Sequence, residues 1–316
     1  MQVRRSLAAA LAAGSLLLAG CAGDDLSEDA ANDDDSTPAA SAGGPVNISG
    51  QNFPEATLVA SMYEQLLEDA GYDPTVRLVD SRSVYIETFP GDVDVVPEYV
   101  GGIVNELNAR KLGDQAEPFT AGDGKELAEQ GSDLLEEQGI TLLDVSEATD
   151  TNAFFVTQEY AEENGVTKLS DLEGTSVVLA AAPDCEGRLD CEGGLVDEYG
   201  IDVTKVLPLG FASDQTYQSV LDGESQLGLT STTDGTLESQ GLVVLEDDKA
   251  IQPAQNLVPA VSSAFLEERP DVAEKLNELM AALTTENLTE LNGRIAVDRE
   301  KPEDVAREFL EQEGLL

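Results

Sequence analysis

The 316-residue sequence contains no histidine and no tryptophan, and only 17 of its residues are lysine or arginine. The absence of histidine excludes Ser-His-Asp catalysis, proton transfer by imidazole and zinc sites built on histidine. The absence of tryptophan argues against a platform on which sugars stack. We therefore expect no enzyme activity and no cofactor. An exported enzyme with paired carboxylates, Glu98 with Glu192 or Asp234, is the alternative left open.

Basic residues are few beside 63 acidic residues, which gives a formal net charge of −46. A body with this charge repels nucleic acid and anionic membrane surfaces, so no nucleic-acid partner is expected. The acids are spread along the chain instead of forming one cluster. This distribution favours adaptation to a salty habitat, and steering of cationic solutes is the other interpretation.

Long apolar runs are also scarce, and the one at residues 7–18 is too short to span a bilayer. It follows Arg4 and Arg5 and ends in Leu18-Ala19-Gly20-Cys21, which resembles the lipobox of a bacterial lipoprotein signal. We expect residues 1–20 to be removed and Cys21 to carry lipid. An ordinary secretory signal cleaved near Ala22 would leave Cys21 without a role. Both interpretations place the protein outside the cytoplasm, and the first anchors it to the cell membrane.

Residues 22–45 contain seven acids, no base and almost no large apolar side chain. Such a segment cannot bury enough surface to offset its chain entropy. With Cys21 it forms a predicted disordered tether at residues 21–45, whose r.m.s. reach is roughly 25 to 30 Å. The tether would let a monomeric body move while it stays near a membrane partner.

Only three cysteines are present, and two of them, Cys185 and Cys191, are separated by five residues. In an exported protein this spacing favours a small-loop disulfide. A two-cysteine metal site is the weaker interpretation, because no further soft ligand lies nearby in the sequence. We expect no metal.

From residue 46 onward strand and helix signals alternate, which is typical of α/β layering. Strands are expected at residues 46–49, 75–79, 92–96, 140–145, 152–157, 176–181, 205–209, 226–230, 242–245 and 255–261. Helices are expected at residues 54–70, 83–89, 99–109, 124–137, 159–164, 195–199 and 214–221, with a helical tail at 270–283, 285–295 and 302–313. We expect lobe 1 at residues 46–150 plus 256–316 and lobe 2 at residues 151–255, with crossing segments near Thr151 and Gln255.

The stretch GDVDVVPEYVGG at residues 91–102 joins a strand to a helix through an aromatic residue. Residues 92–96 are rich in valine, Pro97 is expected to end the hydrogen-bond ladder, and Tyr99 stands where the helix begins. Ligands of open α/β sheets bind at the carboxyl ends of the strands. Tyr99 therefore either faces a ligand or packs against its own helix.

Six short motifs follow one another in residues 46–316, in a fixed order. They are GQNFPE at 50–55, GDVDVVPEYVGG at 91–102, DTNA at 150–153, Arg188 and Asp190 ahead of Gly194-Leu195, TYQ at 216–218 and TDG at 233–235. This set resembles the glycine betaine, choline and osmoprotectant-binding lipoproteins of ABC importers. The resemblance implies a two-lobed α/β fold of the periplasmic-binding type, type II-like, with a two-segment hinge. It also implies delivery of the ligand to an ABC permease in the cytoplasmic membrane.

In that family tyrosines form a cage around a quaternary ammonium, which has no N–H to donate and is held by ring faces. Tyr99 and Tyr217 match two cage positions. At the other two this sequence has Thr57, with Phe53 close by, and Glu192. A carboxylate holds a cation by charge and accepts hydrogen bonds, so ligands with N–H donors become plausible.

Further candidates surround these positions. Ser81 aligns with a ligand-binding threonine of relatives, and Arg82 beside it is either a fork for a ligand carboxylate or an ordinary surface side chain. Asn52, Asn152 and Asp234 are polar residues at strand ends, where capping is the alternative role. The predicted function is capture of a cationic or zwitterionic amine for an ABC permease. The alternatives left open are a receptor for another polar amine, such as an amino acid or an ergothioneine-like betaine, and a surface lipoprotein without a transport role.

Overall fold

The structure is a computed structural model that describes residues 43–316. The predicted signal at residues 1–20 and the predicted lipidation at Cys21 lie outside the described residues, as does nearly all of the predicted tether. The end of the tether needs correction, because strand β1 (Gly44–Gln51) already begins at Gly44. Among residues 43–316 no helix is both long enough and apolar enough to cross a bilayer.

The first sheet has the strand order β2-β1-β3-β10-β4. Its other strands are β2 (Tyr72–Val79), β3 (Val95–Tyr99), β4 (Ile140–Leu142) and β10 (Leu257–Ser262). β1 pairs in parallel with β2 and β3, whereas β10 runs antiparallel to β3 and β4. All residues of β3 and β10 are buried, as expected for strands in the middle of a covered sheet.

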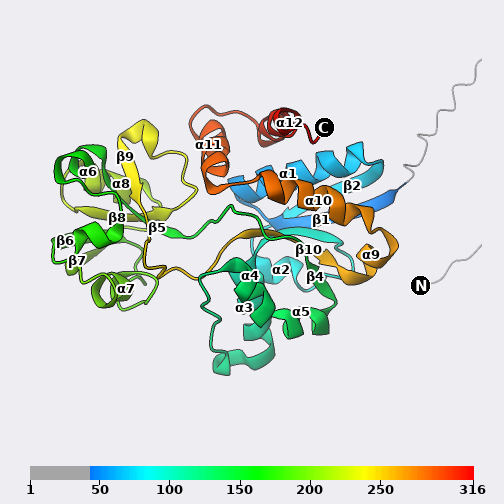
Figure 1. The fold of residues 1–316 in the computed structure, drawn as a ribbon, viewed down its shortest axis with the longest axis horizontal. Coiled ribbons are helices and arrows are strands. Elements are labelled where there is room, and N and C mark those ends of the chain that lie inside the picture. The colour runs from blue at the N-terminus through cyan, green and yellow to red at the C-terminus, as the bar shows by residue number, and fades with distance from the viewer. Residues whose placement is uncertain (1–42) are drawn as a thin grey trace, which may run out of the picture. The chain divides into compact units, whose positions relative to one another are not determined.

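Helix α1 (Pro54–Asp69) and the C-terminal helices cover one face of this sheet. The apolar residues of α1 recur at helical spacing, and Leu58, Met62 and Leu66 are almost completely buried. The tail helices α10 (Asp271–Ala282), α11 (Thr285–Ala296) and α12 (Pro302–Glu313) pack on α1 (Figure 1). The remaining helices of this part are α2 (Arg82–Tyr85), α3 (Val100–Leu112), α4 (Gly124–Gln130), α5 (Ser132–Gln138) and α9 (Ser263–Glu268).

The second sheet has the strand order β7-β6-β8-β5-β9. Its strands are β5 (Asn152–Thr157), β6 (Ser176–Ala181), β7 (Asp202–Pro208), β8 (Leu227–Ser231) and β9 (Leu242–Leu245). Its helices are α6 (Gln158–Asn164), α7 (Glu192–Asp197) and α8 (Asp214–Leu221). Its apolar core is separate from that of the first sheet and contains Phe154, Leu179 and Tyr199.

The two sheets follow the same plan. In each, three strands run in parallel, and the strand that the chain forms first after crossing over, β5 or β10, inserts antiparallel to its neighbours. The crossing segments pair with each other, since Thr149 forms a bridge with Asn256 and the Asp150 amide donates to the Gln255 carbonyl at 3.1 Å. The predicted α/β class, with two crossings and a helical tail, is confirmed.

Strand β3 corrects the prediction made for Pro97. The strand begins at Val95 and continues through Pro97 to Tyr99, where residues 92–96 had been expected. Pro97 lies opposite Pro259 of β10, and β1 is paired with β3 only at Val95. Neither proline has an N–H, so both fit a position of the ladder where none is required. Tyr99 is the last residue of the strand and the N-cap of α3, as predicted.

Other boundaries differ by a few residues. The predicted single helix at 124–137 is two helices, α4 and α5, which meet at Gly131. A Cβ on Gly131 would lie 2.6 Å from the methyl groups of Val104, so glycine lets this junction approach α3. The helix predicted at 83–89 is limited to α2, and α7 starts three residues earlier than the helix expected at 195–199.

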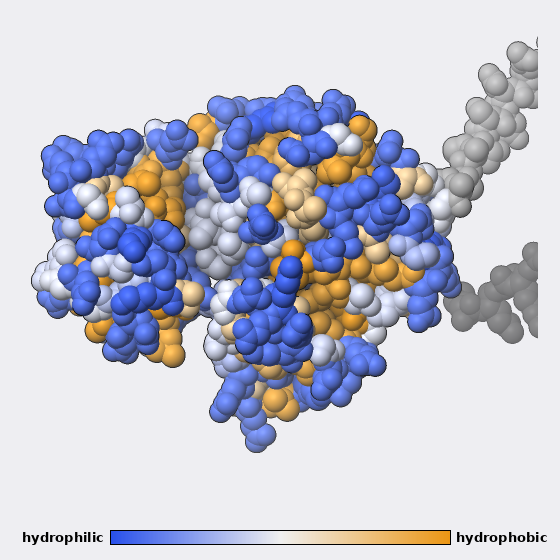
Figure 2. Space-filling model, viewed as in Figure 1, coloured by the Kyte–Doolittle hydropathy of each residue, from blue (hydrophilic) through white to orange (hydrophobic). Residues whose placement is uncertain are grey.

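Hydrophilic residues cover most of the face seen in Figure 2, and apolar residues appear there as separate patches. This surface agrees with an acidic sequence whose charges are spread along the chain. Within the described part of the chain, Glu55 and Glu98 are the only acidic residues in the buried class, with 4% and 1% of their surface exposed. Burial of a carboxylate is costly unless hydrogen bonds or a cation compensate for it, and such acids are frequent at functional sites. Glu55 and Glu98 are therefore the starting points for the site.

Candidate functional site

Tyr99 and Phe53 place two rings at one edge of the first sheet. Tyr99 ends β3, and Phe53 is the N-cap of α1, which follows the neighbouring strand β1. Their ring centroids are 6.4 Å apart with 24° between the planes, and 8% of Tyr99 is exposed. The Tyr99 hydroxyl donates a hydrogen bond to Glu55. The carboxyl ends of two parallel strands thus carry a pair of aromatic rings, one of which is hydrogen-bonded to a buried acid.

Glu55 joins this pair to the C-terminal helices and to lobe 2. Its Oε2 accepts from Nδ2 of Asn292 on α11 at 2.6 Å, and the same Nδ2 donates to the Thr233 carbonyl at 3.1 Å. Burial, followed by the charge of Asp150, raises the pKa of Glu55 from 4.5 to about 7, although the hydrogen bonds of Tyr99, Thr233 and Asn292 oppose the rise. The side-chain oxygen of Asn292 is buried and has no partner among the described residues.

Asp150 lies on the first crossing segment and is the second acid of this group. Burial raises its pKa, against the effect of hydrogen bonds from the Ser231 and Thr233 side chains. The Ser231 hydroxyl donates to Asp150 at 2.5 Å. Among residues 43–316, neither Asp150 nor Glu55 has a lysine or arginine within ion-pair distance. Two carboxylates whose pKa values are raised therefore share a region without a basic partner.

Tyr217 and Asp234 lie together on the lobe 2 side. The Tyr217 hydroxyl donates to Asp234 at 2.6 Å, and its ring packs on Phe155 with centroids 5.5 Å apart. Burial, followed by the acceptor Asp234, raises the pKa of Tyr217 well above its usual range. Asp234 also accepts from the Thr230 hydroxyl and from the amide and hydroxyl of Thr236. These bonds give Asp234 the turn-capping role that the sequence left open for it.

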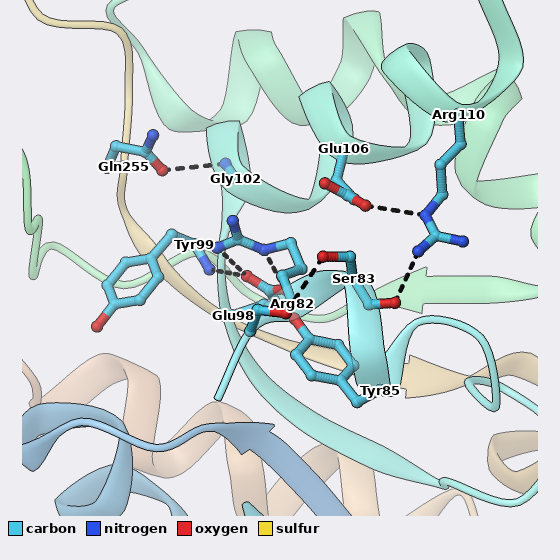
Figure 3. A network of polar contacts seen from close by, with 10 residues as sticks. Arg82, Ser83, Tyr85, Glu98, Tyr99, Gly102, Glu106, Arg110 and Gln255 are labelled. Atoms are coloured by element: carbon cyan, nitrogen blue, oxygen red, sulfur yellow. Dashed lines mark hydrogen bonds and ion pairs between the residues drawn. The ribbon is translucent and has the colours of Figure 1, made fainter. Parts of the chain in front are cut away.

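The carboxylate of Glu98 has all its hydrogen-bond partners inside the first lobe (Figure 3). Arg82 donates to it from Nε at 2.7 Å and from Nη2 at 3.0 Å, and the Tyr85 hydroxyl donates to the same carboxylate. The Tyr99 amide completes the set at 2.9 Å. Figure 3 shows the Tyr99 ring directed away from Tyr85, on the other side of this ion pair. Arg82 is therefore engaged with a protein carboxylate, and it holds the backbone from which Tyr99 projects.

The disulfide loop of lobe 2 carries the next group. Cys185 and Cys191 are bonded, with an S–S distance of 2.01 Å, as the spacing predicted. Inside the loop Arg188 forks onto Asp190, from Nε at 2.9 Å and from Nη2 at 2.6 Å, and Asn152 donates to Asp190 at 3.3 Å. The loop thus fixes Asn152 and Asp190 next to the crossing segments.

A cavity of about 180 Å³ opens at this point. Its lining residues are Asp150, Thr151, Asn152, Asp190, Phe211, Gln252, Pro253 and Gln255. They come from both crossing segments, the disulfide loop and the turn before α8. A groove of about 1190 Å³ is lined by α11 and by residues 232–244, and Asp234 is the one predicted ligand residue among its lining residues. The small cavity lies nearer the acids and is the better candidate for a ligand.

The remaining predicted residues occupy separate places. Asn52 is exposed ahead of α1, and the Thr57 hydroxyl donates to the Phe53 carbonyl at 2.9 Å. The hydroxyls of Ser81 and Ser83 are 3.2 Å apart. Glu192 begins α7 and accepts from the Gly187 amide at 2.8 Å, within its own loop. No hydrogen bond among the described residues joins these four positions to Glu55 or Asp150, and their contact with ligand stays a prediction.

Sequence reasoning passed over four residues of the acidic group: Glu55, Asp150, Ser231 and Asn292. Glu55 and Asp150 stand inside two of the quoted motifs, GQNFPE and DTNA, so a signal was present for both. Each stands beside a residue with a more obvious signal, Phe53 or Asn152. Asn292 stands in the helical tail, where nothing in the sequence indicates its contact with a residue 237 positions away.

Two α/β lobes joined by two crossing segments, with acids and rings gathered at the carboxyl ends of the strands, define the class of two-lobed solute-binding proteins. Residues 44–312 match the family OpuAC, described as the substrate-binding domain of the ABC-type glycine betaine transport system. The chain belongs to this family, and it is the substrate-binding component of an ABC transporter. The family predicted from the six motifs is confirmed.

Curated relatives cover most of the chain. The glycine-betaine-binding protein of Pseudomonas aeruginosa is 27% identical over 286 residues, which span 86% of this chain and 88% of that protein. The glycine betaine-binding protein YehZ of Escherichia coli K12 is 28% identical over 286 residues, which span 86% and 92%. The carnitine transport binding protein OpuCC of Listeria monocytogenes is 24% identical over 277 residues, which span 84% and 86%.

Solved structures support the fold. Apo YehZ from Escherichia coli superposes with a TM-score of 0.72 at 25% identity and covers 86% of this chain and 99% of that one. A structure described as a glycine betaine/carnitine/choline ABC transporter superposes with a TM-score of 0.75 at 23% identity and covers 86% and 98%. The predicted periplasmic-binding architecture is confirmed.

Proposed function

We propose that this protein captures a small amine of the quaternary-ammonium class between its two lobes and delivers it to an ABC permease. In this proposal lobe 1 is residues 46–150 plus 256–316, together with Gly44 and Pro45 at the start of β1, and lobe 2 is residues 151–255. The relatives named for glycine betaine and for carnitine, both quaternary ammonium compounds, support this ligand class. Rotation of the lobes about the crossing segments would bury the ligand and give the permease a closed form to recognise.

The observation that carries the proposal is the group of Glu55 and Asp150 beside the ring of Tyr99. Two carboxylates without a basic partner attract a cation, and a ring face adds to the attraction once water is excluded. One ring contributes about 0.5 to 2 kcal/mol. Micromolar affinity needs about −8 kcal/mol, so the rings must act together with the acids.

The test is a calorimetric titration of the Tyr99→Ala and Tyr217→Ala variants with glycine betaine, choline and carnitine. We expect each substitution to weaken binding at least about tenfold, because a ring face next to the acids is lost. Tyr160→Ala is the matched control, since Tyr160 is a partly buried tyrosine of α6 packed on the core of lobe 2. Affinities equal to that of the unmodified protein in both variants would refute the aromatic site.

We propose different roles for three other predicted ligand residues. Asn152 lines the small cavity and is held by Asp190, which favours a contact with ligand. Asp234 acts through Tyr217, whose hydroxyl it accepts. Arg82 acts through Glu98, which its Nε and Nη2 hold and which accepts from the Tyr99 amide.

Family members are extracytoplasmic, and we propose that this one is held at the membrane by lipid on Cys21. The motif LAGC at residues 18–21 and the acidic stretch after it support an anchor followed by a spacer. Mass spectrometry of the mature N-terminus would test this: a diacylglyceryl cysteine supports the anchor. A mature chain that starts at Ala22 or later excludes it. Replacement of Cys21 by Ala should release the protein from membranes.

A further inference from the structure

We propose that the small cavity at the crossing segments selects an organic cation that has no carboxylate, with the ring of Phe211 as its aromatic wall. This inference rests on the proposed function, because it names the subclass of amine that the site takes. It separates choline-like ligands from zwitterionic betaines. It also assigns a ligand contact to a residue outside the matched motifs.

Phe211 is an exposed aromatic side chain at the edge of the cavity. It lines the space together with Asp150 and Asn152, and 46% of its surface is accessible. The ring brings a large apolar surface to an otherwise polar cavity, and a ligand that covers it would remove that surface from water. A ring face next to a carboxylate is a suitable environment for an ammonium group.

The turn that carries Phe211 is rigid. Its neighbours are Gly210 with φ 117° and Ala212 with φ 45°, a left-handed conformation that a non-glycine residue rarely adopts. The Gly210 amide donates to the Ala181 carbonyl at 3.0 Å, and on the other side of the ring the Ala212 amide donates to the Leu229 carbonyl at 3.3 Å. Because the turn is fixed from both sides, the ring is presented without the entropic cost of ordering a loop.

The charges around the cavity leave no counter-ion for a carboxylate. Its lining contains two acids and the amides of Asn152, Gln252 and Gln255, and none of the described lining residues is basic. Arg188 lies nearby, but its three guanidinium nitrogens are engaged with Asp190 and Asp184 at 2.6 to 2.9 Å. The charge of Asp190 is thereby balanced, and Asp150 has no basic partner among the described residues.

Choline and glycine betaine share the trimethylammonium group and differ at the other end of the molecule. The hydroxyl of choline donates a hydrogen bond to a carboxylate or an amide oxygen, which Asp150 and the glutamines supply. The carboxylate of glycine betaine would face Asp150 without a cation to balance it, a repulsion that low dielectric strengthens. The cavity of about 180 Å³ is smaller than the pockets of roughly 300 to 1,000 Å³ that hold drug-sized ligands, which favours a small cation.

The experiment is calorimetric titration of the mature protein with choline, glycine betaine and 3,3-dimethylbutan-1-ol, the uncharged analogue of choline. We expect choline to bind at least about tenfold more tightly than either of the others. Glycine betaine binding as tightly as choline, or more tightly, would overturn the inference and leave the proposed function intact. Failure of all quaternary amines, carnitine included, to bind would refute the proposed function itself, and the inference with it.

Variants test the role of the ring. Phe211→Leu keeps an apolar side chain and removes the ring face, and we expect it to weaken choline binding about fivefold or more. Phe211→Tyr keeps the ring face and should retain choline binding. Leu189→Ala is the matched control, because Leu189 is 73% exposed on the disulfide loop and does not line the cavity. Melting temperatures of all variants check folding, which an exposed position should leave unchanged. Unaltered choline affinity in a folded Phe211→Leu variant would remove Phe211 from the site.

Discussion

Glu55 illustrates how burial outweighs a favourable local position at the scale of one residue. It stands in the first turn of α1, where the helix dipole favours a negative charge by about 0.3 to 1 kcal/mol. Its pKa nevertheless rises from 4.5 to about 7, because desolvation and the charge of Asp150 exceed that term. Glu55 therefore holds its proton to a higher pH than an exposed glutamate does.

Replacement of Glu55 by Gln should change how stability depends on pH. Because the folded state holds the proton more tightly than the unfolded state, the contribution of Glu55 is fully present below about pH 4.5 and is lost as pH rises through about 7. The loss amounts to about 3 kcal/mol for a shift of this size. Between about pH 5 and pH 8, the melting temperature of Glu55→Gln should therefore fall less than that of the unmodified protein.

Thermal melts across this range give the measurement, with Glu159→Gln on the exposed start of α6 as the control. The comparison is made between variants, since self-repulsion of an acidic protein also grows with pH. Parallel curves for Glu55→Gln and the unmodified protein would mean that Glu55 does not hold a proton.

At the scale of an element, helix α3 begins directly after Tyr99 and depends on another segment for its N-terminal hydrogen bonds. The free amides of its first turn bond to the returning crossing segment. The Val100 amide donates to the Asn256 carbonyl, and the Gly101 amide donates to the Ala254 carbonyl. The Gly102 amide donates to Oε1 of Gln255 at 3.0 Å. The side chain of Tyr99, the N-cap, makes no bond to these amides, and its hydroxyl donates to Glu55 instead. The helix that positions Tyr99 is thus capped by the hinge.

Gly102→Ala should destabilise the protein strongly. A Cβ at this position would lie 2.3 Å from Nη2 of Arg82, so the guanidinium would be displaced from Glu98. A buried carboxylate deprived of its partner costs about 3 to 5 kcal/mol. Chemical denaturation measures the loss.

Gly122→Ala is the control for that substitution, because Gly122 is exposed and its nearest contact would be an ordinary 3.5 Å. We expect it to change stability by less than about 0.5 kcal/mol. Equal stabilities of the Gly102 and Gly122 variants would show that Arg82 can move without losing Glu98.

At the scale of the whole molecule, α11 ties the C-terminal helices of lobe 1 to lobe 2 in addition to the two crossing segments. The Thr289 hydroxyl donates to the Thr232 carbonyl at 3.3 Å, next to the bond from Asn292 to Thr233. Gly235 and Gly293 bring the two backbones into contact, since a Cβ on Gly235 would lie 2.2 Å from the Gly293 nitrogen. Motion of the lobes must therefore slide or break this contact.

Gly235→Ala should separate α11 from lobe 2. Overpacking of about 1 to 3 kcal/mol corresponds to a melting temperature lower by about 2 to 8 °C. Ligand affinity should fall too, because Asn292 would lose the link between Glu55 and Thr233. Calorimetric melts and titrations, with Gly122→Ala alongside, measure both effects. A Gly235→Ala variant with normal stability and affinity would show that the contact is dispensable.

Local sequence signals predicted many of the elements well. Helices α8 and α12 and strands β5, β6 and β9 have the predicted bounds, because each combines a clear apolar period with a capping or turn residue at its ends. Tyr99 was placed at the junction of strand and helix by the same means. Pro97 misled the prediction, because its effect depends on the strand opposite it and that strand contains Pro259.

The site was predicted less completely than the fold. Tyr99, Tyr217 and Asp234 were singled out from motifs, and the structure gives each an acid or a ring as its neighbour. Phe211 was not singled out, because a single phenylalanine after a glycine carries no local signal of exposure. Its orientation follows from the left-handed turn and from hydrogen bonds to two other strands.

The sequence by itself determined the α/β class with two crossings, the disulfide and the position of Tyr99 at the end of a strand. These depend on composition, on apolar periods and on neighbours within a few residues. Only the tertiary structure decided that Glu55 meets Asp150 and Asn292, that Arg82 is engaged by Glu98, and that Phe211 faces a cavity. Those relations join residues far apart in the chain, and their energies arise from burial and charge that exist only after folding.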